Sequence, residues 1–107
     1  DVSRKLAESV ASKEYDEGIL FCWTETGATI VANKITGVRA ALCSDAESAK
    51  GARKWNHANI LVMSLRLTSE ALAKEILDAW FSTSYCKEDF DIRNVKKISE
   101  IESKYNK

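Results

Sequence analysis

A cysteine, three threonines and a glutamate stand close together near the first long apolar run of the chain. The stretch GILFCWTETGATIVANK, residues 18–34, places Cys22 where a buried strand is predicted to end and a helix to begin. A thiol just before a helix N-terminus has its thiolate form favoured by the helix dipole and by free backbone N–H groups. Such a thiol can remove a proton from a substrate, although a lone cysteine at a strand end is also compatible with a small buried core residue.

Short apolar runs alternate with amphipathic stretches along the rest of the chain. The apolar runs predict strands over residues 18–23, 38–43 and 59–65. Apolar residues spaced for one face of a helix predict helices over residues 3–13, 28–34, 45–55 and 68–81, and then a charged closing helix with a stripe of Ile92, Val95, Ile98, Ile101 and Tyr105. The alternation predicts one α/β domain over residues 1–107, a three-layer α/β/α sandwich with a parallel, Rossmann-like sheet.

Helix-capping residues support two of these boundaries. Ser44 and Glu47 have the Ser-x-x-Glu spacing of a capping box, and Thr68 or Ser69 is a suitable cap for the following helix. In open α/β sheets, ligands bind outside the carboxyl ends of the strands. The segments 22–27, 43–45 and 64–66 are therefore the places to expect a functional site.

Three strands make a small sheet. The run at residues 18–23 is apolar throughout, which is typical of a strand with neighbours on both sides. We therefore expect a small or truncated sheet that is short of at least one strand.

The composition excludes some classes of function. Lys and Arg number 16 and so do Asp and Glu, so a net charge of zero gives no support to a nucleic-acid or membrane-binding surface. No apolar run approaches the ~20 residues that span a bilayer. Three cysteines without close pairing favour a reducing, cytoplasmic setting over a disulfide framework, and they lack the paired spacing of a metal site.

Four collinear blocks resemble one known family. They are Cys22 to Gly27, Ala32-Asn33-Lys34, Gly37 to Leu42, and Ala52-Arg53 followed by Asn56 and Ala58-Asn59. In order and spacing this pattern is similar to the ribose-5-phosphate isomerase B and galactose-6-phosphate isomerase family of sugar-phosphate isomerases. The resemblance extends over nearly the whole chain, and four blocks in register are more specific than one.

The resemblance implies aldose–ketose isomerisation of a phosphorylated sugar through an enediolate, without a cofactor or a metal. Cys22 matches the family's proton-abstracting base, and Thr24 matches a threonine beside it. The positions that match substrate-binding residues are Gly27, Asn33, Asn56, Arg66 and Arg93. The resemblance also implies a homodimer or higher oligomer, with the site at the subunit interface.

Several residues depart from the family pattern. Trp23 and Glu25 replace two glycines of the cysteine loop, and Trp55 stands where the family has a ring-opening histidine. The single histidine, His57, lies two positions later, and we expect it at the surface, with a relocated acid–base group as the alternative. Phe90 and Asp91 stand where many members have arginine and histidine.

Family members usually begin earlier, with a first strand that carries an Asp-His motif, a helix and a second strand. The chain is therefore expected to be a truncated or divergent sugar-phosphate isomerase. The alternative is a catalytically inactive isomerase-like module that binds or serves as a scaffold.

Overall fold

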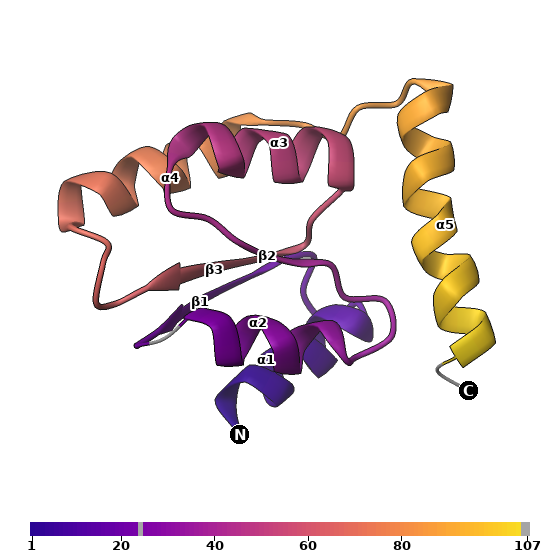
Figure 1. Ribbon diagram of the computed structural model, residues 1–107, viewed down its shortest axis with the longest axis horizontal. Coiled ribbons are helices and arrows are strands. Elements are labelled where there is room, and N and C mark those ends of the chain that lie inside the picture. Colours follow the sequence, from indigo (N-terminus) through magenta and orange to yellow (C-terminus); the bar gives the residue numbers. More distant parts are fainter. Residues whose placement is uncertain (24, 106–107) are drawn as a thin grey trace.

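The computed structural model describes residues 1–23 and 25–105, which form a three-layer α/β/α sandwich (Figure 1). The strands are β1 (Gly18–Cys22), β2 (Ala40–Leu42) and β3 (Ile60–Ser64). The helices are α1 (Val2–Ala11), α2 (Glu25–Asn33), α3 (Ala46–Asn56), α4 (Glu70–Ser82) and α5 (Asp89–Tyr105). Helices α1 and α2 cover one face of the sheet, α3 and α4 cover the other, and α5 stands beside the sandwich. The predicted α/β sandwich is confirmed.

The sheet is parallel, with strand order β1-β3-β2. Every residue of β3 is buried, as expected for a central strand covered on both faces. β1 has the apolar sequence of a strand with neighbours on both sides. Within residues 1–23 and 25–105 it pairs only with β3, as expected for a sheet short of a strand, in a register that runs from Gly18 opposite Ile60 to Cys22 opposite Ser64. Because β1 is an edge strand here, Phe21 remains 44% exposed.

Two helix starts differ from the sequence-based expectation. Asp45, rather than Ser44, caps α3, because its carboxylate accepts a hydrogen bond of 2.7 Å from the Ser48 N–H. Helix α2 begins at Glu25, three residues earlier than expected, so Gly27 lies in its first turn and not in a loop. The expectation for α4 is confirmed, since Ser69 caps that helix.

The core has two parts, one on each face of the sheet. Alternate residues of β3 point to opposite faces, so Leu61 and Met63 pack with Ile76 and Trp80 of α4. The other part contains Ile60 and Val62 with Leu20, Ala28, Ala32, Val38, Ala7 and Val10. Of the helices described, none is long and apolar enough to cross a membrane.

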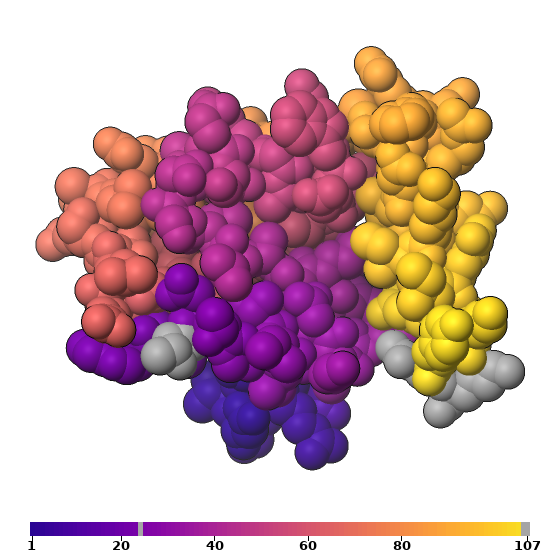
Figure 2. Space-filling model, in the orientation of Figure 1, coloured from indigo at the N-terminus to yellow at the C-terminus, as the bar shows by residue number. Residues whose placement is uncertain are grey.

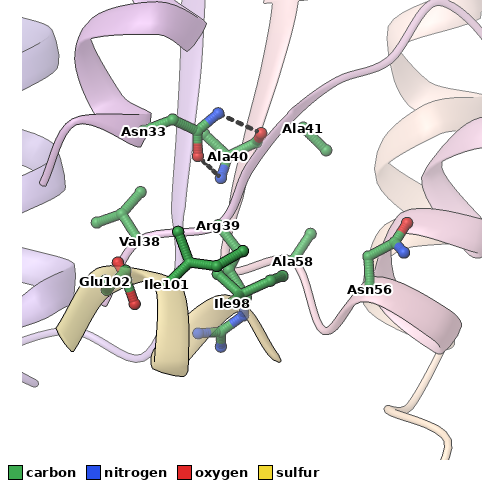
Figure 3. A pocket seen from close by; sticks show the side chains of 10 residues that line it. All are labelled: Asn33, Val38, Arg39, Ala40, Ala41, Asn56, Ala58, Ile98, Ile101 and Glu102. Atoms are coloured by element: carbon green, nitrogen blue, oxygen red, sulfur yellow. Dashed lines mark hydrogen bonds between the residues drawn. The ribbon is translucent and has the colours of Figure 1, made fainter. Parts of the chain in front are cut away.

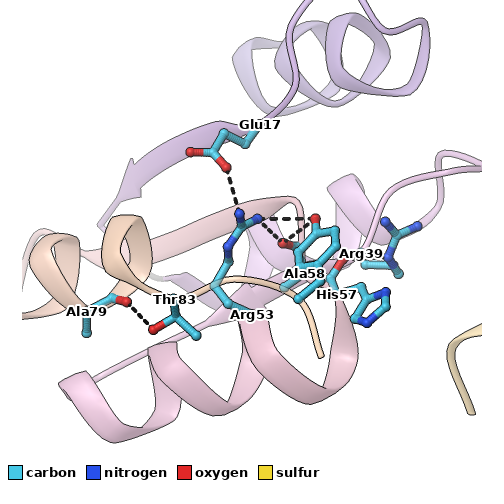
Figure 4. Close-up of polar contacts among 8 residues, drawn as sticks. Glu17, Arg39, Arg53, His57, Ala58, Ala79 and Thr83 are labelled. Carbon is cyan, nitrogen blue, oxygen red and sulfur yellow. Dashed lines mark hydrogen bonds and ion pairs between the residues drawn. The ribbon is translucent and has the colours of Figure 1, made fainter. Parts of the chain in front are cut away.

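A single guanidinium joins three segments at the amino ends of the strands (Figure 4). Arg53 of α3 forms an ion pair of 3.1 Å with Glu17 before β1, and its Nη1 donates to the Ala58 carbonyl before β3 at 2.7 Å. Its planar group lies 4.5 Å from the ring centroid of Tyr85 and 4.8 Å from that of Trp80. The Arg53 side chain is only 14% exposed, so these contacts are shielded from water. The contact to Tyr85 fixes the segment between α4 and α5.

Asn59 connects the same ends of the three strands from inside the sheet. It is 3% exposed, and its side chain accepts from the Arg39 N–H at 2.7 Å and donates to the Gly37 carbonyl at 3.0 Å. Its own carbonyl accepts from the Gly18 N–H at 3.0 Å. A buried amide is tolerated here because its polar groups have partners.

We predict that Arg53→Lys lowers the free energy of unfolding by about 2–3 kcal/mol, although the charge is kept. A lysine cannot reach the Glu17 and Ala58 oxygens together, nor stack flat between the two rings. Urea unfolding followed by circular dichroism measures the change. Arg4→Lys is the matched control, because Arg4 pairs with Glu8 on an exposed helix face, where such pairs contribute little. Equal stability of the two variants would contradict this role for Arg53.

Candidate active site

A small cavity lies at the carboxyl edge of the sheet, where the sequence predicts a site. Its volume is about 200 Å³, and its lining residues come from the segment after β1, from the last residue of β3 and the segment that follows it, and from the first turn of α2. The described lining residues are Trp23, Glu25, Thr26, Ser64, Arg66 and Leu67. The buried Ser64 holds two sides of the cavity together, because its hydroxyl donates to the Trp23 carbonyl at 3.3 Å and accepts from the Leu67 N–H at 3.1 Å.

The cavity has charges of both signs. Glu25 is half-buried at the start of α2, and Arg66 is exposed on the segment after β3. Among the residues that the structure describes, neither side chain takes part in an ion pair within 4.0 Å. Trp23 is 64% exposed and forms a wall of the cavity. An apolar wall with one cationic and one anionic group suits a small polar ligand that has an anionic end.

Cys22 is the last residue of β1, as predicted. Its carbonyl accepts from the Leu65 N–H at 2.9 Å, which joins the ends of β1 and β3. The residue is partly buried and packs against the core between the sheet and helices α1 and α2. It directly precedes Trp23, which lines the cavity, but is not itself a lining residue. Thr24, the predicted neighbour of the base, lies outside the described residues.

Gly27 is exposed in the first turn of α2. A Cβ atom added at this position would have no neighbour within 4 Å, so the glycine leaves the helix start open to solvent. The N–H groups in the first turn of a helix have no carbonyl partner inside the helix. They are suited to hold an anionic oxygen.

Two other predicted residues lie at the opposite edge of the sheet (Figure 3). Asn33 and Asn56 line a cavity of about 480 Å³ between the start of β2 and helix α5, together with Ile98 and Ile101. The Asn33 carboxamide accepts from the Ala40 N–H at 2.8 Å and donates to the Ala40 carbonyl at 2.9 Å. Within one chain, Asn33 and Asn56 are thus separated from the cavity beside Cys22.

Arg93 lies on α5, at the far end of the molecule from the carboxyl ends of β1 and β3 (Figure 1). Helix α5 forms a separate ridge along one side of the body (Figure 2). None of its described residues is buried, and the apolar stripe includes Ile92 at 43%, Ile101 at 59% and Tyr105 at 71% exposed. One hydrogen bond of 2.8 Å, from the Gly37 N–H to the Glu102 carboxylate, links its last turns to the body.

We expected His57 to lie free at the surface, but the residue is half-buried. It ends α3 in a left-handed conformation with φ of 51°. Its ring stacks on Tyr85 with the centroids 4.4 Å apart, and Nε2 lies 2.9 Å from the Cys86 carbonyl oxygen. These contacts give His57 a structural role at the amino edge, away from the cavity with Glu25.

Sequence reasoning placed Ser64 in a segment where a site was expected, residues 64–66, but did not name it as a candidate site residue. The signal was a polar residue at the end of an otherwise apolar strand. It can be interpreted only when β1 and β3 are known to be neighbours, which brings Ser64 next to Cys22 and Trp23.

Comparisons with known proteins agree with this fold. A parallel sandwich with a cavity at the carboxyl edge of its sheet is typical of α/β proteins that bind small ligands. The family model described as Ribose/Galactose Isomerase matches residues 1–101. The chain belongs to this family of sugar-phosphate isomerases.

Three relatives illustrate the match. The chain is 42% identical to D-erythrulose-4-phosphate isomerase of Pectobacterium atrosepticum, over 79% of this chain and 56% of the relative. It is 43% identical to ribose-5-phosphate isomerase B of Escherichia coli, over 76% of this chain and 54% of the relative. The solved structure of ribose-5-phosphate isomerase B from Clostridium thermocellum superposes with a TM-score of 0.92 at 41% identity, over 96% of this chain and 69% of that one. The chain thus spans a little over half the length of these two curated relatives.

We predict that Cys43 resists thiol reagents in the native protein at pH 8. Burial, with a smaller contribution from the negative charge of Asp45, raises the pKa of this thiol from 9.0 to about 11. A raised pKa means that the thiolate, which is the reactive form, becomes abundant only well above pH 9. Cys22 and Cys86 are both partly exposed, and we expect them to react before Cys43, although a hydrogen bond with Asp91 also raises the pKa of the Cys86 thiol.

Titration with a chromogenic disulfide, before and after unfolding in urea, counts the protected thiols. Cys43→Ser should remove the thiol that appears only on unfolding. A native Cys43 that reacts as fast as the other two thiols would contradict the prediction.

Proposed function

We propose that this chain catalyses the interconversion of an aldose phosphate and a ketose phosphate, with Cys22 as the base that removes the proton next to the carbonyl. The observation that carries the proposal is the position of Cys22 at the end of β1, directly before the cavity at the start of α2, in a chain of the ribose/galactose isomerase family. The names of two relatives point to a ribose or an erythrulose phosphate as the first substrates to test.

The cavity supplies the other functions that the reaction needs. The first-turn N–H groups of α2, including that of Gly27, stabilise the enediolate oxygen as negative charge develops. Arg66 binds the phosphate, for which a guanidinium has the matching fork geometry. Thr24 is proposed to position the substrate beside Cys22.

We further propose a homodimer or higher oligomer in which the partner completes each site. Asn33, Asn56 and Arg93 lie on the other side of the chain from Cys22, so they can contribute to substrate binding only at a neighbouring subunit's cavity. The uncovered apolar stripe of α5 supports such an association, since a second copy would bury it. The free thiols Cys22, Cys43 and Cys86 are compatible with a reducing cytoplasm.

The alternative is an inactive isomerase-like binding module. Glu25 favours it, because a carboxylate beside an anion site repels phosphate and enediolate. Family membership, the open helix start and the cationic Arg66 favour the enzyme.

We predict that Cys22→Ala lowers kcat for ribose 5-phosphate or erythrulose 4-phosphate isomerisation by at least about 100-fold, the usual contribution of a positioned base. Conversion of aldose to ketose, followed by NMR, measures the rate. Cys86→Ala is the control, because Cys86 lies in the segment before α5. Absence of turnover by the unaltered chain with either sugar phosphate would favour the binding module.

A second prediction concerns the shared site. Arg93→Ala alone should raise KM by about tenfold or more if the partner's arginine holds phosphate, since charged hydrogen bonds contribute about 1.5–3 kcal/mol. When Cys22→Ala and Arg93→Ala chains are mixed, half the dimers are mixed and each has one intact site, so at substrate concentrations well below KM about a quarter of the unaltered kcat/KM should be measured. A mixture whose kcat/KM is only the mean of those of its two components would contradict a site built from two subunits.

A further inference from the structure

Aldose–ketose isomerisation moves two hydrogens. One passes between neighbouring carbon atoms, and the proposed function assigns it to Cys22. The other passes between the two oxygen atoms, because the hydroxyl of the aldose becomes the carbonyl of the ketose. A side chain that accepts and returns this second proton must lie in the same cavity as the substrate and be basic near neutral pH.

Among the described residues that line the cavity beside α2, one meets this requirement. The guanidinium of Arg66 and the indole of Trp23 offer hydrogen-bond donors only. The hydroxyls of Thr26 and Ser64 are weak bases, and that of Ser64 is already bonded to the Trp23 carbonyl and the Leu67 N–H. The remaining polar side chain is the carboxylate of Glu25.

The position of Glu25 suits this task. As the first residue of α2, it lies where the positive end of the helix dipole stabilises a negative charge. Thr29 donates to the Glu25 backbone carbonyl at 2.6 Å and so fixes the main chain. Within residues 1–23 and 25–105 the Glu25 carboxylate takes part in no ion pair, so it is available to a ligand in the cavity.

The positive charge of Arg66 offsets the repulsion between the Glu25 carboxylate and an anionic substrate. Arg66 lines the same cavity from the segment after β3, while Glu25 lines it from the start of α2. An anionic substrate can thus place its phosphate at Arg66 and its hydroxyl groups at Glu25. The substrate phosphate and the Glu25 carboxylate, which repel each other, are then held apart within one site.

We propose that Glu25 is the second acid–base residue of the isomerisation, a proposal that rests on the proposed function. The Cys22 thiolate takes the hydrogen from the carbon that bears the hydroxyl, which gives the enediolate and a thiol. Glu25 takes the proton of that hydroxyl as its oxygen becomes the carbonyl, and returns it to the former carbonyl oxygen. The Cys22 thiol then protonates the former carbonyl carbon, so both groups end in their starting forms.

A purely structural role for Glu25 would be to stabilise the start of α2. Glu70 provides the matched control, because it is the first residue of α4 and does not line the cavity. Glu25→Gln and Glu70→Gln each remove one carboxylate from the first turn of a helix. Melting temperatures of the two variants should therefore fall by similar small amounts.

The test compares the unaltered chain with Glu25→Gln, Glu70→Gln and Cys22→Ala, on ribose 5-phosphate and erythrulose 4-phosphate in D₂O. Glu25→Gln should lower kcat at least about 100-fold with KM changed by less than about threefold, because glutamine keeps the hydrogen bonds but cannot take a proton. NMR should show that it still exchanges the hydrogen next to the carbonyl with solvent. Cys22→Ala should lose both isomerisation and exchange.

Three results distinguish a failure of this inference from a failure of the proposed function. A Glu25→Gln chain that isomerises as fast as Glu70→Gln overturns the inference and leaves the proposed function standing. So does a Glu25→Gln chain that loses exchange as completely as isomerisation, because Glu25 then does not act at the oxygen step alone. An unaltered chain without turnover overturns the proposed function, and the inference with it.

Discussion

The structure depends most on the partly buried guanidinium of Arg53. It brings together the approach to β1 through Glu17, the approach to β3 through Ala58, and the segment before α5 through Tyr85. These elements are far apart in sequence. Charge-assisted bonds that are shielded from water have strict geometry, so they add to the apolar core in favouring the observed register of β1 against β3.

That register determines which residues meet at the other, carboxyl ends of β1 and β3. With Gly18 opposite Ile60, Cys22 is placed opposite Ser64, and Ser64 then bonds to the Trp23 carbonyl. A shift of one residue would turn every side chain of β1 to the other face of the sheet. The anchoring residues and the cavity thus occupy opposite edges of one sheet, and β3 connects them.

Much of the fold can be predicted from the sequence. The alternation of apolar runs and amphipathic stretches indicates the layers, because it reflects which faces are buried. The start of α2 could not be predicted, since Glu25 and Thr26 look like loop residues until the end of β1 is placed. Cys22, Gly27 and Arg66 could be assigned to the carboxyl edge from their positions after strands. The separation of Asn33, Asn56 and Arg93 from them could not, because it depends on how α2, α3 and α5 turn in space.

The Asn33 carboxamide has a consequence for how the sheet can grow. By bonding both the N–H and the carbonyl of Ala40, it occupies the outward-facing backbone groups at the start of β2 as a neighbouring strand would. A side chain thus hinders the addition of a strand at that border. Along the described residues of β1, no side chain bonds the backbone in this way, so an added strand is favoured beside β1.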